Sequence, residues 1–194
     1  MAISSNGVAG LKTGVCTSTT RPSGPYEGQM IYETDTDMVA IWNGTAWRYL
    51  AATTPTQGSV LQVVTGNTST GVSNATSTYA DSGLTATITP KSTSSRILVQ
   101  VFQFFGKSNG NSENRVQVKI VRNSTDLINS GGLLNYSGSA IYSITSCAMA
   151  HIDAPNTTSA TTYKTQFMNP SGTASAVAQY GDGTSTIVLM ELAG

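Results

Sequence analysis

Three side chains in this sequence are the best suited to nucleophilic or metal chemistry: Cys16, Cys147 and the single histidine, His151. One histidine excludes a multi-histidine metal site and leaves one possible imidazole base. If Cys147 and His151 share a strand face, they lie about 13 Å apart at ~3.3 Å per residue, too far to touch. We therefore predict that His151 faces solvent or an interface and is not a catalytic base.

The carboxylates show no pattern of a hydrolytic or metal site. Glycosidases need two carboxyl groups a few Å apart, whereas the acids of the C-terminal part are scattered over separate segments: Asp81, Glu113, Asp126, Asp153, Asp182 and Glu191. The chain has no Gly-x-Ser-x-Gly elbow. Asp35 and Asp37 fit a turn better than a calcium loop, because further oxygen ligands do not follow them. The sequence predicts no catalytic residue, metal ligand or cofactor.

The composition is poor in charge. Charged residues make up 10% of the 194 residues, with ten basic and ten acidic side chains, against roughly 25% in an average domain. A nucleic-acid-binding protein needs a basic face to neutralise phosphates, and this sequence contains no run of Lys or Arg. At 39% hydrophobic and zero net charge, the chain also differs from disordered proteins. We expect a folded protein that binds no nucleic acid.

The start of the chain, MAISSNGVAGLK, lacks the charged and apolar regions of a secretory signal. No run approaches the ~20 apolar residues of a membrane span. We expect synthesis in a cytoplasm, without a signal peptide and without membrane insertion. Cys16 and Cys147 fall in different candidate modules, so both are expected to be free thiols.

The elements of the N-terminal part follow from turn residues. The run RPSGP at 21–25 disfavours a helix, and strands are expected at 29–33 and 38–42. Asn43-Gly44 favours a two-residue type I′ hairpin, which would pair Trp42 with Thr45, Ala40 with Trp47, and Met38 with Tyr49. These pairs would place one large apolar face on a three-stranded β-meander.

A meander of this size is marginally stable alone, so its aromatic face needs a cover. One interpretation is that the two tryptophans fill a local core. The alternative is that this face is covered by the second domain, by neighbouring copies or by a different protein, and the last two are favoured. The residues expected to dock on the virion are Tyr26, Met38, Trp42, Trp47 and Tyr49.

Residues 59–194 predict an all-β sandwich, because short apolar runs recur between turn-rich stretches. Residues 115–120 alternate strictly between polar and apolar. Two segments break the rule: 97–105 and 187–192 carry large apolar side chains on both faces. The outer face of a sandwich normally meets water, so these strands are expected to contact neighbouring subunits through Phe102, Phe104, Leu189 and Met190.

The expected architecture is therefore a small β-meander followed by a jelly-roll-like β-sandwich that resembles the tumour-necrosis-factor fold and forms a homotrimer. We divide the chain into an N-terminal arm at 1–20, a docking module at 21–50, a linker at 51–58 and the sandwich at 59–194. The arm is Gly/Ser/Thr-rich and is expected to order only against a neighbour.

The run RPSGPYEGQMIYETDTDMVAIWNGTAWRYL at 21–50 resembles a module of tailed-bacteriophage structural proteins, R-P-S-x-P-Y-x-G-Q-x-I-Y-E-T-D-T-D followed by W-N-G-x-A-W. The module occurs in tail-fibre and other virion appendage proteins. The segments SVLQVVTG, STYADSGLTATITPKSTSSRILVQV, IDAPNTTSATTYKTQF and TSTIVLMELAG are similar to the β-rich terminal domain of many such fibres. This resemblance implies a virion component, commonly trimeric, without catalytic residues.

Three functions of different classes stay open. The first is a structural fibre, spike or decoration appendage of the virion (a tail or capsid fibre) that contacts itself and other virion proteins. The second is a viral attachment module that binds a host surface glycan through loops 107–114 and 129–139, with Asn109, Asn111 and Tyr136 as ligand residues. The third, the least favoured, is a polysaccharide depolymerase.

Overall fold

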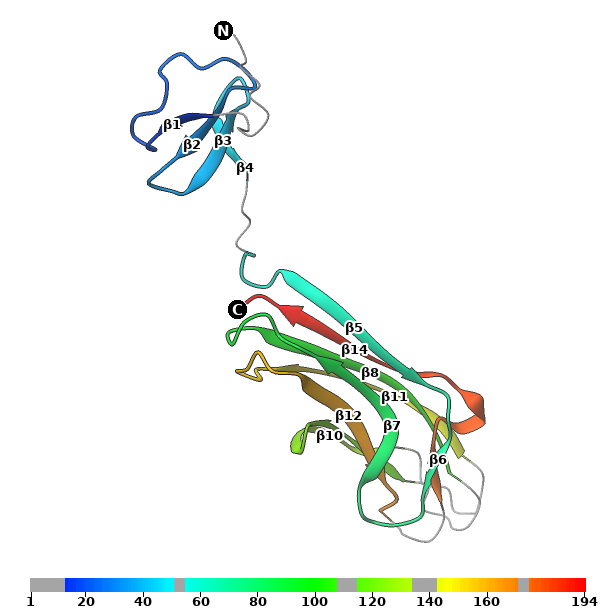
Figure 1. Ribbon diagram of the computed structural model, residues 1–194. Helices are drawn as coiled ribbons and strands as arrows, with labels where there is room; N and C mark the ends of the chain where they lie inside the picture. The colour runs from blue at the N-terminus through cyan, green and yellow to red at the C-terminus, as the bar shows by residue number, and fades with distance from the viewer. Residues whose placement is uncertain (1–12, 51–54, 108–114, 134–142, 171–174) are drawn as a thin grey trace, which may run out of the picture. The chain divides into compact units, whose positions relative to one another are not determined.

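A computed structural model of the protein describes residues 13–50, 55–107, 115–133, 143–170 and 175–194 (Figure 1). The chain divides into two compact units, Met1–Thr54 and Pro55–Gly194. The regular elements among the described residues are strands, apart from one 3-10 turn at Tyr180–Asp182, and turns and irregular segments connect them. The predicted all-β class is confirmed. No helix in these described ranges has the length and apolar character to cross a membrane.

The N-terminal unit is one sheet of four strands: β1 (Gly14–Cys16), β2 (Met30–Glu33), β3 (Met38–Trp42) and β4 (Trp47–Leu50). The order is β1-β2-β3-β4, so β2 to β4 form the expected meander and β1 lies parallel to β2. The assignment of 1–20 to an arm is therefore wrong for β1 and the turn after it. The Thr34 amide donates to Cys16 O at 3.0 Å and the Ser18 amide donates to Asp35 Oδ1 at 2.8 Å, and both bonds tie this segment to the sheet.

The connection between β3 and β4 is longer than predicted. Asn43 Oδ1 accepts hydrogen bonds from the Thr45 and Ala46 amides, at 3.0 and 2.8 Å, so four residues make the turn. Trp42 therefore pairs with Trp47 and Ala40 with Tyr49. Because side chains alternate with a period of two, a shift of two residues leaves each on its predicted face.

The second unit is a sandwich of two sheets. Its strands are β5 (Val60–Thr68), β6 (Val72–Asn74), β7 (Ala80–Ile88), β8 (Arg96–Lys107), β9 (Val116–Arg122), β10 (Thr125–Leu133), β11 (Ser143–Asp153), β12 (Thr161–Met168), β13 (Ala176–Ala178) and β14 (Ser185–Leu192). One sheet, the β12 sheet, has the order β10-β9-β12-β7. In the other, the β8 sheet, β8 lies between β14 and β11, and β5 pairs with β14. The β6–β13 pair extends the β5–β14 pair.

The chain alternates between these sheets as a jelly roll does. It runs from β5 in the β8 sheet to β7 in the β12 sheet, returns in β8, and crosses again for β9 and β10. The strands β11, β12 and β14 then alternate in the same way. Figure 1 shows β5, β14 and β8 running side by side. The predicted jelly-roll-like sandwich is present.

The core lies between the two sheets and follows the period of two. Val99, Ile187 and Leu189 from the β8 sheet pack in one cluster with Ile120 and Tyr163 from the β12 sheet, and all five are buried. A second cluster contains Phe105 and Phe167, whose ring centroids are 5.8 Å apart. With one set of alternate residues filling the core, the other set lies on the outer faces.

Candidate interaction surfaces

The outer face of the β8 sheet is apolar. One row of directly opposed residues crosses four strands from Ile152 through Leu98 and Met190 to Val63. Ile152 is 46% exposed and Val63 53%. The face as a whole is called the β8 outer face below. Most of its residues are apolar: Val60, Val63, Leu98, Phe102, Phe104, Ile144, Ala148, Ala150, Ile152, Val188, Met190 and Leu192; its uncharged polar residues are Thr65, Asn67, Gln100, Ser146 and Thr186. Arg96 is the one charged residue at these outward strand positions among the described residues.

Aromatic rings on and beside this face pack against one another and against glycines. The Phe102 and Phe104 rings meet edge to face, with centroids 5.0 Å apart. Phe104 covers Gly183, where an added Cβ would lie 2.9 Å from its ring, and Tyr180 covers Gly106, where an added Cβ would overlap the tyrosine ring. Both glycines therefore let an aromatic ring approach the backbone closely, at β8 for Gly106 and just before β14 for Gly183.

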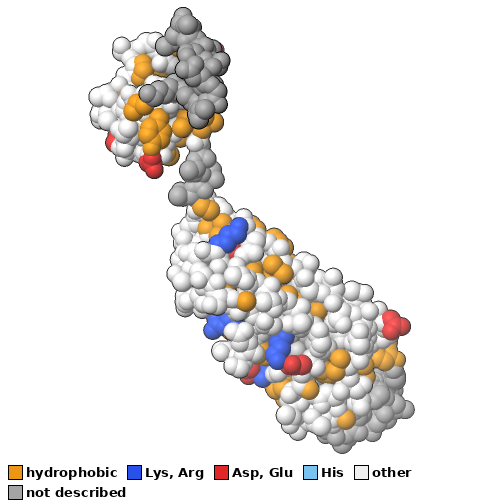
Figure 2. All heavy atoms as spheres, in the orientation of Figure 1, with side chains coloured by type: hydrophobic (Ala, Val, Ile, Leu, Met, Phe, Trp, Pro, Cys, Tyr) orange, Lys and Arg blue, Asp and Glu red, His pale blue; other side chains and the backbone are white. Residues whose placement is uncertain are grey.

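The outer face of the β12 sheet is polar. Asp81, Gln166, Lys119 and Asn129 form a row of opposed residues across its four strands. Lys119 Nζ donates to Asp126 Oδ1 at 2.8 Å, and Lys164 Nζ donates to Asp81 Oδ2 at the same distance. On the visible side of the sandwich in Figure 2, much of the surface is white, the colour of the backbone and of uncharged polar side chains, and blue and red side chains lie next to one another among smaller orange areas. The two outer faces differ in polarity, and only the outer face of the β12 sheet has the composition of a solvent-exposed surface.

Three of the four residues predicted for a subunit contact lie on the β8 outer face. Phe102 is 46% exposed, and Phe104 and Met190 are half-buried. The prediction for Leu189 is wrong, because it is fully buried in the core. The segment 187–192 is apolar on both faces, so its sequence could not show which set of alternate residues points inward.

One face of the N-terminal sheet is closed by a buried carboxylate. Glu33, with no exposed area, forms an ion pair with Arg21 and accepts a hydrogen bond from Tyr49 Oη at 3.0 Å. Arg21 Nη2 also donates to Tyr49 Oη at 2.8 Å. The hydrogen bond from Arg21, then those from Tyr49 and Thr36, hold the pKa of Glu33 below its usual value against the opposing effect of desolvation. Arg21 thus anchors the segment before β2 across the sheet.

The lowered pKa of Glu33 predicts acid sensitivity of this unit. A carboxyl whose pKa is depressed by folding stabilises the folded state above its unfolded pKa of about 4.3, and this stabilisation is lost as the pH falls through the folded pKa. Both tryptophans lie in this unit, so their fluorescence reports on it alone. We expect the melting temperature of this unit to decrease when the pH is lowered below about 4.

The matched variant for this prediction is Glu33→Gln. Its N-terminal unit should melt at a lower temperature at neutral pH, and that melting temperature should decrease less on acidification. Hydrogen bonds from Ser18 lower the pKa of Asp35 as well. Asp35 is present in both proteins, so its contribution to the pH dependence of stability cancels in the comparison. Equal pH dependence in both proteins would show that the Arg21–Glu33 pair does not stabilise the unit.

The five residues predicted to dock occupy or flank this same closed side. Trp42 and Trp47 are half-buried, with ring centroids 5.6 Å apart. Met38 is also half-buried, whereas Tyr26 is 71% exposed and Tyr49 40%. Local packing and surface exposure therefore occur together on this side.

The opposite face of the N-terminal sheet, called the open face below, was not singled out by the sequence. Val15, Tyr32, Val39 and Leu50 form one row of opposed residues across all four strands, and Met30 and Ile41 form part of the next row. Val15 is 67% exposed, Leu50 50% and Met30 42%. The sequence could not predict the complete row, because Val15 belongs to β1, a strand that was not expected.

The residues with catalytic potential are not brought together. Cys147 is buried in the sandwich, and burial raises the pKa of its thiol to about 11, so it stays protonated. It pairs with Gln103 and His151 pairs with Val99, four positions apart along β11. Within the described ranges, no three His, Cys, Asp or Glu side chains lie close enough to hold a metal ion. Asn109, Asn111 and Tyr136, the predicted ligand residues, lie outside the described residues.

Comparison with known proteins gives no relative: no protein-family model matches the sequence, and no curated protein matches it.

Proposed function

We propose that this protein is a structural appendage of a bacteriophage virion, built as a homotrimer of jelly-roll domains and attached to the particle through its N-terminal unit. The observation that carries the proposal is the β8 outer face, where most outward residues of three neighbouring strands are apolar, whereas the outer face of the β12 sheet is polar. The phage assignment rests on the resemblance of residues 21–50 to the module of virion appendage proteins.

The apolar face favours association between copies. Soluble monomers rarely leave a contiguous apolar patch of this kind in water. A surface with one charged residue, Arg96, offers no electrostatic means of choosing a partner, and burial of apolar area is then the main gain. Closed rings of identical subunits bury such a face completely and leave none for further growth. The resemblance to fibre proteins favours three subunits.

The N-terminal unit is the candidate for attachment. It is a compact unit separate from the sandwich, and its Trp and Tyr side chains are of the types that dominate protein interfaces. Tyr26 is the most exposed of them at 71%. In this proposal Tyr26 and Tyr49 contact another virion protein, while Trp42 and Trp47 pack against each other on the same side of the sheet as Tyr49.

Deletion of residues 1–54 tests this division of roles. We expect the remaining Pro55–Gly194 unit to keep its far-ultraviolet circular dichroism and its trimeric mass, because the sandwich core and the β8 outer face are intact. Particles assembled with the truncated protein should contain none of it. Normal incorporation of the truncated protein, measured by immunoblot of purified particles, would contradict attachment through the N-terminal unit.

Immunogold labelling of intact particles with an antibody against residues 55–194 tests the function itself. Label on the particle surface is expected. Label over the capsid would identify a head fibre or decoration protein, whereas label at the tail would favour the alternative function, host recognition. Absence of the protein from purified particles, with the antibody active on the isolated protein, would contradict the proposal.

A further inference from the structure

The open face of the N-terminal sheet is only partly covered, since Tyr32, Val39 and Ile41 at its centre are half-buried. The other face is closed by the Arg21–Glu33–Tyr49 cluster and buries Ile31 and Ala40 almost completely. On the open face, by contrast, Val15, Met30 and Leu50 are each at least 42% exposed. A small sheet with one apolar face in water is marginally stable, so this face is expected to be buried in the assembled protein.

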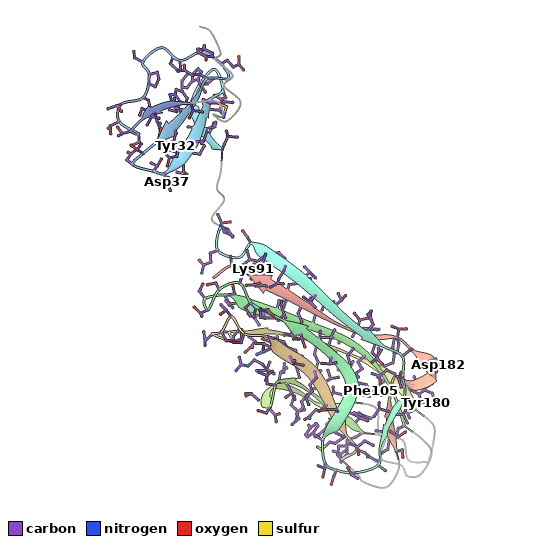
Figure 3. The ribbon with its side chains drawn as sticks, viewed as in Figure 1. Tyr32, Asp37, Lys91, Phe105, Tyr180 and Asp182 are labelled. Carbon is purple, nitrogen blue, oxygen red and sulfur yellow. The ribbon has the colours of Figure 1, made fainter. Side chains whose placement is uncertain are left out.

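The chemistry of the open face fits a copy of itself. Its two rows contain Val15, Tyr32, Val39 and Leu50, then Met30, Ile41 and Arg48. Arg48 is the single charged residue in these rows, and it sits on β4 at the sheet edge, where its head group can stay in water. The Tyr32 hydroxyl donates to Asp37 (Figure 3), so it needs no donor or acceptor from a partner. The Asp37 carboxylate is exposed in the β2–β3 turn and stays in water, so the rows themselves require an apolar partner surface.

A short connection joins each N-terminal sheet to its own sandwich, so sheets of associated copies are held near one another. Leu50 and Pro55 are five residues apart, which limits their separation to about 18 Å in any conformation. On the sandwich side the chain is fixed, since the Gly58 amide donates to Ala193 O at 2.7 Å and the Ala193 amide to Ser59 O at 2.9 Å. The next pair, Val60 with Leu192, already belongs to the β8 outer face.

The tether thus begins beside the face through which the sandwiches are proposed to associate. In that trimer, three N-terminal sheets are attached near one another, and a short tether holds such groups at an effective concentration of about 1 mM. A virion protein would have to compete with this local concentration. The short connection therefore favours the N-terminal sheet of a neighbouring copy as the surface that covers the open face.

We infer that the open faces of the N-terminal sheets pack against one another, so that this protein associates through two separate apolar surfaces. This inference rests on the proposed trimer. It assigns opposite sides of the N-terminal sheet to different partners. The face with Val39 at its centre meets other copies, and the side with Tyr26 and Tyr49 is left for the virion.

Photo-crosslinking in the full chain tests the inference. A benzophenone amino acid replaces Val39 in one protein and Thr45, exposed on the β3–β4 connection, in the matched control. After irradiation, we expect covalent dimers and trimers on a denaturing gel from the Val39 protein, at a yield about tenfold above the Thr45 protein. Both positions share the same local concentration, so the difference reports that position 39 alone lies in the proposed contact. Mass spectrometry should map the links to β1, β2 or β4 of another chain.

Sedimentation of the same samples separates the two proposals. A trimer with equal yields at the two positions would overturn the inference and leave the trimer proposal standing. Links from position 39 to residues 1–12 of the same chain would also overturn it, because that segment would then be the cover. A monomer with no intermolecular links would contradict both. As a second measurement, Leu50→Asp should speed amide hydrogen exchange in β3 of the trimer, and unchanged exchange would count against the inference.

Discussion

Replacing Phe102 with aspartate is expected to convert the trimer into a folded monomer. Phe102 is 46% exposed at the middle of β8, and Ala148 and Thr186 lie directly opposite it on the two neighbouring strands. In a ring of three subunits, the substitution places one carboxylate in each of the three apolar contacts. An uncompensated buried charge costs about 3–5 kcal/mol, so association should fail at micromolar concentration. Sedimentation measures the mass, and circular dichroism confirms that the sandwich stays folded.

The matched control is Thr87→Asp. Thr87 is exposed on β7, on the polar outer face of the β12 sheet, and this substitution should leave the trimer intact. If Phe102→Asp and Thr87→Asp proteins have the same mass as the unmodified protein, the β8 outer face is not the contact surface. If both become monomers, the loss reflects added negative charge and not the position.

Gly66→Ala is expected to cause the largest loss of stability in the sandwich. At Gly66, β5 of the β8 sheet approaches β7 of the β12 sheet, and an added Cβ would overlap the Thr85 carbonyl oxygen and lie 2.9 Å from its carbonyl carbon. Backbone atoms cannot rotate away as a side chain can, so the two sheets must separate locally. Overpacking commonly costs 1–3 kcal/mol, and we expect about 3 kcal/mol or more here.

The control for this substitution is Gly71→Ala. The nearest atoms to a Cβ at Gly71 are 3.9 Å away, an ordinary contact, so its effect on the free energy of unfolding should be small. Urea denaturation of the Pro55–Gly194 unit, followed by circular dichroism, measures both. Equal unfolding midpoints for the two variants would show that the sheets are not held together as closely at Gly66 as the structure describes.

The sandwich was predictable because its strands keep a period of two. The alternation at residues 115–120 places Val116, Val118 and Ile120 in the core, where all three are buried. Where a strand is apolar on both faces, the pattern identifies an unusual strand but not its inward side. Met190 and Leu189 differ by one position, and packing between the sheets decides that Leu189 is in the core.

The N-terminal sheet was harder to predict, because its contacts join residues far apart in sequence. The strand β1 has three residues and pairs in parallel with β2 fourteen or more positions later, beyond the reach of any local pattern. Asn43 forms a four-residue turn through its own side chain, although Asn-Gly favours a shorter one.

The buried ion pair left one signal in the sequence. Glu33 lies two positions from Ile31, on the same face as the buried Ala40. An acid at an inward position of a strand needs a partner, but nothing local indicates that the partner is Arg21, twelve residues away. The pattern could predict that a cation approaches this face, and the fold was needed to identify it.

Sedimentation equilibrium of the purified full chain at micromolar concentration tests the central claim most directly. The account predicts a single species with three times the 20.2 kDa mass of one chain. It also predicts that this species persists in high salt, because burial of apolar surface is not screened as charge pairs are. A stable species at the mass of one chain under the same conditions would contradict the claim that the β8 outer face is covered by other copies.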